Sequence, residues 1–164
     1  MRIGVISDTH IPDRAEEIPA QIIEDFKKVD MIVHAGDLVD LKVLDKLKSI
    51  CPKVVAVWGN MDPREVRSKL SEKEIFEVAG HRIGLMHGFG APVNLIEFLS
   101  GAFRDDAVEV VIFGHAHCPV NEKRQGVLYF NPGSPTDKIY CQYNSYGIIE
   151  INDKVEARIV KIKA

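Results

Sequence analysis

Five short apolar stretches, each ended by glycine or a polar residue, limit what this 164-residue chain can fold into. They are rich in valine and isoleucine and only a few residues long, which is typical of buried β-strands rather than of helices. The stretches run from Arg2 to Ser7, Met31 to Val33, Val54 to Trp58, Ile83 to Met86 and Val108 to Phe113. They predict a fold built around buried strands.

Helical periodicity separates the first three of these stretches. Apolar residues share one face from Ile18 to Phe26 and again from Leu41 to Ile50, where Asp40 is the expected N-cap. Strands that alternate with helices form a parallel sheet with right-handed crossovers. The first third of the chain therefore predicts a β-α-β-α-β unit.

The second half of the chain has a different pattern. It predicts a helix from Val93 to Phe103, and then short strands joined by turns. The further strands are Ile75 to Val78, Val127 to Phe130, Gln142 to Glu150 and Val155 to Ile162, with hairpin turns at Gly80-His81 and Asn152-Asp153. We expect one α/β domain, residues 1–164, in which two sheets pack face to face with helices outside.

The composition argues against several classes of protein. The net charge of −3 and the absence of a dense lysine and arginine run disfavour a nucleic-acid-binding surface. Cys51, Cys118 and Cys141 are odd in number and lack a C-x-x-C spacing, which disfavours disulfides or a zinc knuckle. No apolar run approaches the ~18 to 20 residues of a membrane span, and no signal-peptide pattern opens the chain. We expect a cytoplasmic protein without membrane contact, and a homo-oligomer is compatible with the sequence.

Residues that can bind metal or transfer protons follow all five apolar stretches. The continuations are Ser7-Asp8-Thr9-His10, His34-Ala35-Gly36-Asp37, Gly59-Asn60-Met61-Asp62, His87-Gly88 and Gly114-His115-Ala116-His117. In α/β sheets ligands bind outside the carboxyl ends of strands, because the loops there converge. The sequence therefore predicts that these distant side chains meet.

The types of these side chains indicate a cluster of metal ions. Aspartate can bridge two cations, histidine supplies a neutral nitrogen and asparagine an amide oxygen. A mixed oxygen and nitrogen set without thiolate suits Mn, Fe, Zn, Co or Ni better than Mg or Ca. Seven candidate ligands exceed the needs of one tetrahedral ion and suit two ions roughly 3.5–4 Å apart that share a carboxylate.

Spacing within the motifs supports this interpretation. Asp8 and His10 are two residues apart, as are His115 and His117, so an extended backbone directs both members of each pair to one face. Glycines beside the candidate ligands would let the backbone turn tightly and approach the ions closely. These glycines are Gly36, Gly59 and Gly114.

The order of the motifs resembles that of the calcineurin-like metallophosphoesterases. That family carries D-x-H, G-D, G-N-x-[DE], H and G-H-x-H in this order, and all five occur here between residues 8 and 117. The Asn131-Pro132-Gly133-Ser134 segment is similar to the short-chain phosphodiesterase branch, although alone it predicts only a turn. The resemblance covers essentially the whole chain and implies a four-layer αββα fold.

The resemblance also implies two sets of metal ligands. The first set is Asp8, His10, Asp37 and His117. The second set is Asp37, Asn60, His87 and His115, with Asp37 as the bridge. Three of these residues, Asp37, Asn60 and His87, are also assigned to catalysis.

The implied cofactors are two divalent transition metal ions, with Mn²⁺ favoured and Ni²⁺, Co²⁺, Fe²⁺ or Zn²⁺ as alternatives. The implied reaction is hydrolysis of a small phosphodiester by in-line attack of a hydroxide held between the ions.

One position departs from the family pattern. Many members carry a histidine after the asparagine of G-N-x-[DE], where it protonates the leaving group, but this chain has Met61. A thioether cannot donate a proton, and Asp62 has no histidine to orient there. We hypothesise that the enzyme favours good leaving groups, such as those of aryl or nucleoside phosphodiesters, or protonates through water.

Other interpretations stay open at this point. Taken alone, Asp8 is typical of a turn, Asp37 of a helix cap and His87 of a core histidine. A eukaryotic retromer subunit resembles the family, and residues 11–14 (Ile-Pro-Asp-Arg) are similar to it, so a protein-interaction scaffold is one alternative function. A nuclease is another, although the chain has no room for a capping domain and little positive charge.

Several residues near the motifs have expectations of their own. His34 belongs to the strand segment before Gly36-Asp37 and should have a structural or supporting role, whereas His81 should be a solvated surface residue. Cys118 should be a small buried hydrophobic residue. Trp58 and Phe89 should belong to the core or to a pocket wall.

Overall fold

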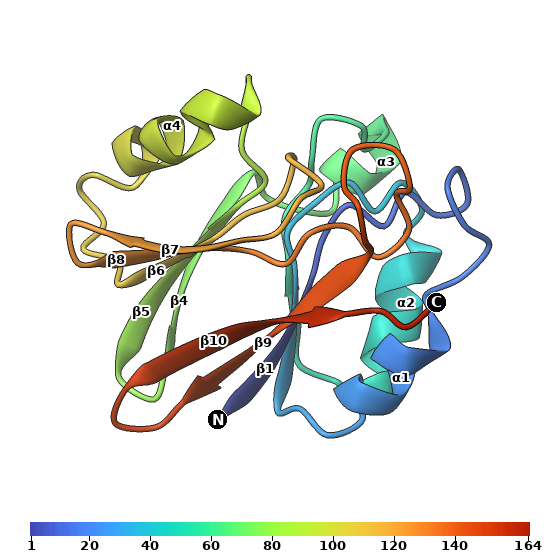
Figure 1. Cartoon of the computed structure of the whole chain (residues 1–164), viewed down its shortest axis with the longest axis horizontal. Helices are drawn as coiled ribbons and strands as arrows, with labels where there is room; N and C mark the ends of the chain where they lie inside the picture. Colours follow the sequence, from blue (N-terminus) through green and yellow to red (C-terminus); the bar gives the residue numbers. More distant parts are fainter.

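Two five-stranded sheets pack face to face in the computed structural model, which describes residues 1–164 (Figure 1). The strand orders are β10-β9-β1-β2-β3 and β4-β5-β6-β8-β7. The strands of the first sheet are β1 (Arg2–Ile6), β2 (Met31–His34), β3 (Val54–Ala56), β9 (Ser145–Ile151) and β10 (Val155–Lys161). Those of the second are β4 (Lys73–Val78), β5 (His81–Met86), β6 (Val110–Ile112), β7 (Val120–Arg124) and β8 (Val127–Asn131).

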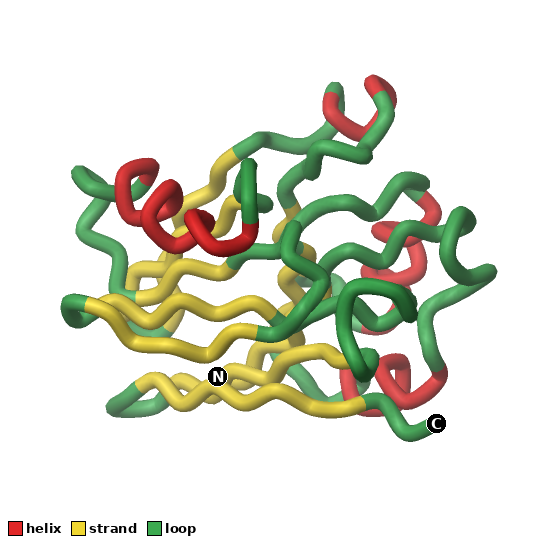
Figure 2. The backbone as a smooth tube through the Cα atoms, turned by 45° about the horizontal axis from the view of Figure 1, so that its top comes forward, coloured by secondary structure: helices red, strands yellow, loops and turns green.

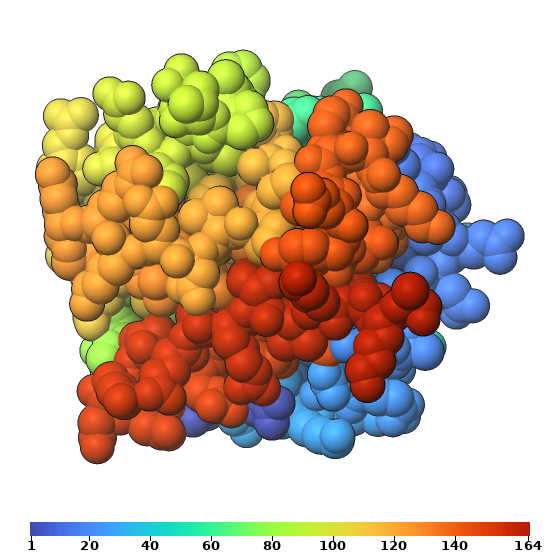
Figure 3. Space-filling model, viewed as in Figure 1, coloured from blue at the N-terminus to red at the C-terminus, as the bar shows by residue number.

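The first sheet contains the predicted β-α-β-α-β unit. Strand β1 pairs in parallel with β2, which pairs in parallel with β3, and the crossovers are α1 (Ala20–Phe26) and α2 (Lys42–Ile50). The N-cap of α2 is Leu41, so the prediction of Asp40 is wrong by one residue, although the Asp40 carboxylate accepts a hydrogen bond from the Lys42 N–H at 2.8 Å. Strands β9 and β10 extend the sheet as an antiparallel hairpin, which covers the lower part of the face in Figure 3.

The second sheet is mixed, and helix α4 (Leu95–Ala102) follows β5 after a 3₁₀ turn at Pro92–Asn94. The β4–β5 turn is Ala79-Gly80, so the predicted Gly80-His81 turn is wrong by one residue because His81 already pairs with Val78. Strand β7 was not predicted, since four of its five residues are polar or charged and exposed. The short helix α3 (Arg64–Arg67) was also missed.

Three buried apolar clusters hold the layers together. One lies between the two sheets, the second joins α1 and α2 to the first sheet, and the third joins α4 to the second sheet. This order of helix, sheet, sheet and helix confirms the predicted four-layer αββα fold, and burial of these apolar faces is its main source of stability. None of the helices is both long and apolar enough to cross a bilayer.

The loops that follow the parallel strands gather on one side of the molecule. Figure 2 shows them as green segments beyond the yellow strands, and they carry all five sequence motifs. The two sheets contribute different loops, since β1, β2 and β3 belong to the first sheet and β5 and β6 to the second. Packing of one sheet on the other therefore brings the motifs together.

Candidate metal centre

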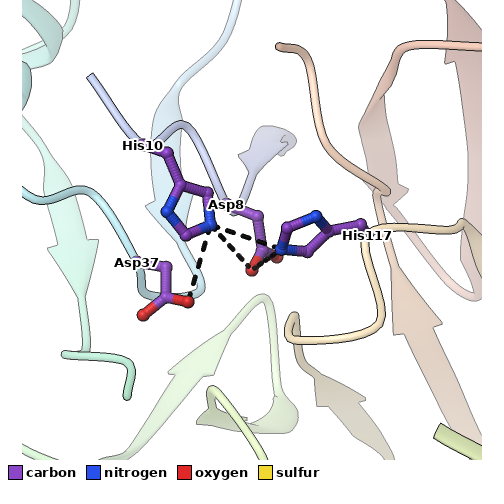
Figure 4. Close-up of side chains that lie close together, drawn as sticks. All are labelled: Asp8, His10, Asp37 and His117. Atoms are coloured by element: carbon purple, nitrogen blue, oxygen red, sulfur yellow. Dashed lines mark hydrogen bonds and ion pairs between the residues drawn. The ribbon is translucent and has the colours of Figure 1, made fainter. Parts of the chain in front are cut away.

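The first predicted ligand set forms a compact buried group. Asp8, His10, Asp37 and His117 each offer one ligand atom, and these atoms all lie within 4.8 Å of one another. Figure 4 shows both imidazole rings and both carboxylates directed toward a common point. His10 Nε2 is 3.3 Å from His117 Nε2 and 3.6 Å from Asp37 Oδ2.

The second predicted set adjoins the first through Asp37. Asn60 Oδ1 lies 3.1 Å from His87 Nε2 and 3.0 Å from His115 Nδ1. Asp37 Oδ2 lies 3.3 Å from His87 Nε2, while the same oxygen faces His10 of the first set. The structure thus brings all seven predicted residues together, with one aspartate oxygen between the two groups.

Two features of the donors fit a divalent cation. Asp8 Oδ1 is buried and receives no hydrogen bond, although His117 Nε2 is 3.3 Å away. The Nε2 atoms of His10 and His117 also face each other, and two such lone pairs repel unless a proton or cation lies between them. Buried polar atoms normally have partners, so these atoms have the arrangement that a cation would satisfy. Their oxygen and nitrogen chemistry suits a transition metal.

The outer nitrogens of three histidines are held by acceptors. His87 Nδ1 donates to the Ala35 carbonyl at 2.7 Å, and His115 Nε2 donates to the Gly90 carbonyl at 2.8 Å. His117 Nδ1 is hydrogen-bonded to the Asp137 carboxylate. A carbonyl can only accept, so the outer nitrogens of His87 and His115 carry a proton, and the inner nitrogen of each ring is the one that could bind a cation. Metal-binding histidines usually have such outer partners, which fix the ring and raise its basicity.

The two aspartates are oriented in the same way. Asp8 Oδ2 accepts hydrogen bonds from Ser7 Oγ at 2.6 Å and from the His115 N–H at 3.1 Å. Asp37 Oδ1 accepts one from the Met61 N–H at 2.7 Å. Each carboxylate therefore has one oxygen fixed by the protein and the other free to face the cluster.

Asp62 has a role that the sequence did not reveal. Its carboxylate accepts hydrogen bonds from three backbone N–H groups, those of Gly59 at 2.7 Å, Asp37 at 2.9 Å and Val39 at 2.6 Å. It thereby fastens the loop of Asp37 to the loop of Asn60. Burial raises the pKa of this carboxyl group.

The titratable side chains of the cluster interact strongly through their charges. Burial disfavours the charged form of Asp8 and would raise its pKa. The attraction of the nearby histidines, above all His87, has the larger effect and holds the pKa of Asp8 far below its ordinary range. Burial also disfavours protonated His87 and His117, yet Asp8 and its neighbouring carboxylates raise the pKa of each to about 9. A cation that binds here must therefore displace protons.

The backbone of the motifs is left-handed at both members of the Asp8 and His10 pair and of the His115 and His117 pair, so the extended backbone predicted from the two-residue spacing is wrong. Positive φ angles occur at five of the seven candidate ligands, namely Asp8 (53°), His10 (42°), Asp37 (57°), His115 (70°) and His117 (59°). Such angles are rare outside glycine and are concentrated at functional sites. Gly36 has a φ of +96°, and a Cβ there would lie 2.7 Å from His87 Nδ1, so a side chain at this position would displace a ligand.

The Asn131-Pro132-Gly133-Ser134 segment is a buried support rather than a simple turn. Asn131 Nδ2 donates to the Gly114 carbonyl at 2.8 Å, and Ser134 Oγ donates to the Asp8 carbonyl at 2.8 Å. The Ser134 N–H donates to the His117 carbonyl at 2.9 Å. The segment therefore connects the loops after β1 and β6.

The remaining sequence expectations have mixed outcomes. His34 is fully buried and hydrogen-bonded to Thr9 Oγ1 and to the Gly36 N–H, which confirms its predicted supporting role. Burial lowers the pKa of this histidine to about 4. The prediction for His81 is wrong, because it is half-buried and bonded to Glu109 Oε2 at 2.8 Å. The prediction for Cys118 is also wrong, because this residue is only half-buried.

Two cavities adjoin the cluster, and Asn60 lines both. The first measures about 450 Å³ and is lined by candidate ligands together with Arg14, Met61 and Tyr140. The second measures about 410 Å³, and Trp58 and Phe89 belong to its wall, which confirms their predicted placement. Both volumes are in the range of small-molecule sites.

Comparison with known proteins agrees with the geometry. The sequence profile of the calcineurin-like phosphoesterase superfamily domain matches residues 1–154. This chain belongs to that superfamily. Its membership confirms the resemblance found in the motifs and accounts for the metal-binding character of the cluster.

Individual relatives are consistent with this assignment. A probable metallophosphoesterase of Methanocaldococcus jannaschii is 41% identical over 166 residues, which cover 99% of this chain and 82% of the relative. A phosphodiesterase of the same organism is 30% identical over 146 residues, or 81% of this chain and 83% of the relative. The crystal structure of Entamoeba histolytica Vps29 complexed with Zn²⁺ superposes with a TM-score of 0.80 at 26% identity, covering 98% of this chain and 99% of that one.

The hydrogen bond between Asp137 and His117 generates a prediction about metal affinity. Asp137→Asn should weaken Mn²⁺ binding by about 10- to 100-fold, because the neutral amide no longer raises the basicity of the imidazole. Isothermal titration calorimetry measures the change, and the exposed Asp153→Asn is a matched control that should bind as the unaltered chain does. Equal affinity in the two variants would contradict the supporting role of Asp137.

Proposed function

We propose that this protein is a two-metal phosphodiesterase that cleaves small phosphate diesters. The observation that supports this most is the position of Asp37 Oδ2, between His10 of one donor set and His87 of the other. A carboxylate oxygen shared by two donor sets is what a pair of ions roughly 3.5–4 Å apart requires. Membership of a phosphoesterase superfamily supports the same reaction class.

The seven donors would divide as the motif order implied. The first ion would be held by Asp8, His10, Asp37 and His117. The second ion would be held by Asp37, Asn60, His87 and His115. When bound, two such ions supply an activated water at neutral pH and neutralise the phosphate oxygens. We propose Mn²⁺ as the resident metal, with Ni²⁺, Co²⁺, Fe²⁺ or Zn²⁺ as substitutes, and a cytoplasmic location.

The chain's own residues would position the ester. Arg14 lines the first cavity and is only loosely paired, since its Nη1 is 3.8 Å from Asp137 Oδ1. A guanidinium in this place can bind a phosphate oxygen through charge-assisted hydrogen bonds. Met61 lines the same cavity with 59% of its surface exposed, and it supplies no proton donor.

The scaffold and nuclease alternatives have less support. A scaffold with a vestigial site would not need seven donors converged and oriented by partners such as Asp62. A nuclease would need a positive surface, and the net charge here is −3. We therefore propose a small diester, rather than a nucleic acid or another protein, as the ligand of the cluster.

The bridging role of Asp37 is tested by removal of one charge. Asp37→Asn should lower the turnover of an aryl phosphodiester with Mn²⁺ by at least about 100-fold, while the fold is kept because the amide retains the size of the carboxylate. Steady-state kinetics and circular dichroism measure both effects. Asp13→Asn changes a residue on the wall of the same cavity outside the donor sets, and it should stay within a few-fold of the unaltered chain. Full turnover in Asp37→Asn would refute the bridge.

The absence of a proton donor at Met61 is tested by a series of aryl phosphodiesters. The rate should fall steeply as the leaving-group pKa rises, because no side chain at this position protonates the departing oxygen. Met61→His should flatten the slope, whereas Met61→Leu should keep it. A flat dependence in the unaltered chain would show that another group acts as the acid.

A further inference from the structure

The second cavity has an aromatic wall that the metal centre does not use. Trp58 follows β3, Phe89 follows β5 and Phe98 lies on α4, so three separate elements contribute rings. Helix α4 forms the yellow-green upper edge of the face seen in Figure 3. Asn60 and His87 also line this cavity, which places it directly beside the second donor set.

Two of these rings are unusually accessible to water. Phe89 is 68% exposed and Phe98 40% exposed, and their ring centroids are 6.5 Å apart with an interplanar angle of 53°. Exposed apolar side chains that gather beside polar groups often mark a ligand-binding surface. Here the polar groups are candidate metal ligands, so a ligand that covers the rings would also reach the cluster.

The backbone on both sides of Phe89 is joined to the cluster. Gly88 (φ +95°) and Gly90 (φ +88°) allow the sharp bends on either side of it. The Gly90 carbonyl accepts the hydrogen bond from His115, and His87 precedes the loop directly. A group whose phosphate is bound at the cluster would therefore have its ester substituent within reach of this ring.

Trp58 is held in place by Arg67. The guanidinium carbon of Arg67 lies 4.7 Å from the centre of the indole ring. The same guanidinium donates to the Asn60 carbonyl at 2.6 Å and to the Asp62 carbonyl at 2.7 Å. The tryptophan is thus stacked on a cation that is itself bonded to the loop of Asn60, and both Trp58 and Arg67 line the cavity.

We propose that this cavity binds the planar aromatic group of the substrate, a nucleobase or an aryl ring, while the phosphate is held at the metal centre. This inference rests on the proposed function and narrows its substrate class to aromatic esters. Planar rings stack on phenylalanine and tryptophan without hydrogen bonds that distinguish one base from another, so the site would accept several bases. The volume of about 410 Å³ is adequate for a small ligand group.

Trp58 is the chain's single tryptophan, so its fluorescence reports directly on this cavity. The full chain loaded with Mn²⁺ is titrated with adenosine 5′-monophosphate, with ribose 5-phosphate and with inorganic phosphate. The adenosine compound should quench Trp58 and bind about tenfold more tightly than ribose 5-phosphate, which has the same phosphate and sugar but no base.

Substitutions on the wall complete the test. Phe89→Ala should remove most of the advantage of the base, and Phe89→Leu should remove part of it. Val93→Ala is the matched control, because Val93 lies four residues after Phe89, is 89% exposed and does not line the cavity, and it should leave both affinities unchanged. Because Phe89 and Val93 are exposed, all three variants should fold.

The outcomes separate this inference from the proposed function. Equal affinities for the two sugar phosphates, or an unchanged preference in Phe89→Ala, would overturn the aromatic subsite even if diesters are hydrolysed. A monomer–dimer shift in Phe89→Ala on sedimentation, with unchanged ligand affinity, would overturn it in favour of a contact between two copies of the chain. Failure of every phosphate ester to be hydrolysed with any metal would instead refute the proposed function.

Discussion

The geometry of the Asp37 carboxylate is the constraint on which the site depends. One oxygen is fixed by the Met61 N–H, and the other faces ring nitrogens from both donor sets. Those nitrogens belong to loops from two different sheets. The Asp37 oxygen can therefore face both of them only when the two sheets are packed together. The fold and the candidate site are therefore coupled, because the apolar layer between the sheets sets the distance between the two donor sets.

Concentrating so many polar and charged groups in one buried place is unfavourable unless each has a partner. The structure provides partners in layers. Asp62 gathers three backbone N–H groups, Ser134 and Asn131 connect neighbouring loops, and carbonyls or Asp137 hold the histidines. These bonds also hold five candidate ligand residues at positive φ angles, each costing on the order of 1–3 kcal/mol. Asp8 Oδ1 accepts no hydrogen bond and faces the histidine nitrogens of the cluster, which is where a cation would be held.

Much of this arrangement could be predicted from the sequence. Strands with buried faces on both sides have a clear apolar pattern, and the polar residues after them are positioned by the general rule for carboxyl ends of strands. All seven predicted ligands meet as a consequence. The helices that cover the outer faces of the two sheets could also be predicted, since the apolar residues of α1, α2 and α4 recur at helical spacing.

Other features could not be predicted, because their signals depend on tertiary structure. Strand β7 is an edge strand with exposed polar residues, so it lacks apolar alternation. Asp137 supports His117 from a loop twenty residues away, and no local pattern distinguishes it from a surface aspartate. His81 has a partner only because β5 and β6 are neighbours, which brings Glu109 to it. The aromatic wall likewise combines three elements that are unrelated in sequence.

The central claim is that Asp37 lies between two cations. Anomalous diffraction at the manganese edge, from crystals grown with excess Mn²⁺, tests it most directly. We expect two peaks, one beside Asp8, His10 and His117 and one beside Asn60, His87 and His115, with a carboxylate oxygen of Asp37 in contact with both. A single peak, or two peaks of which only one contacts Asp37, would contradict the account.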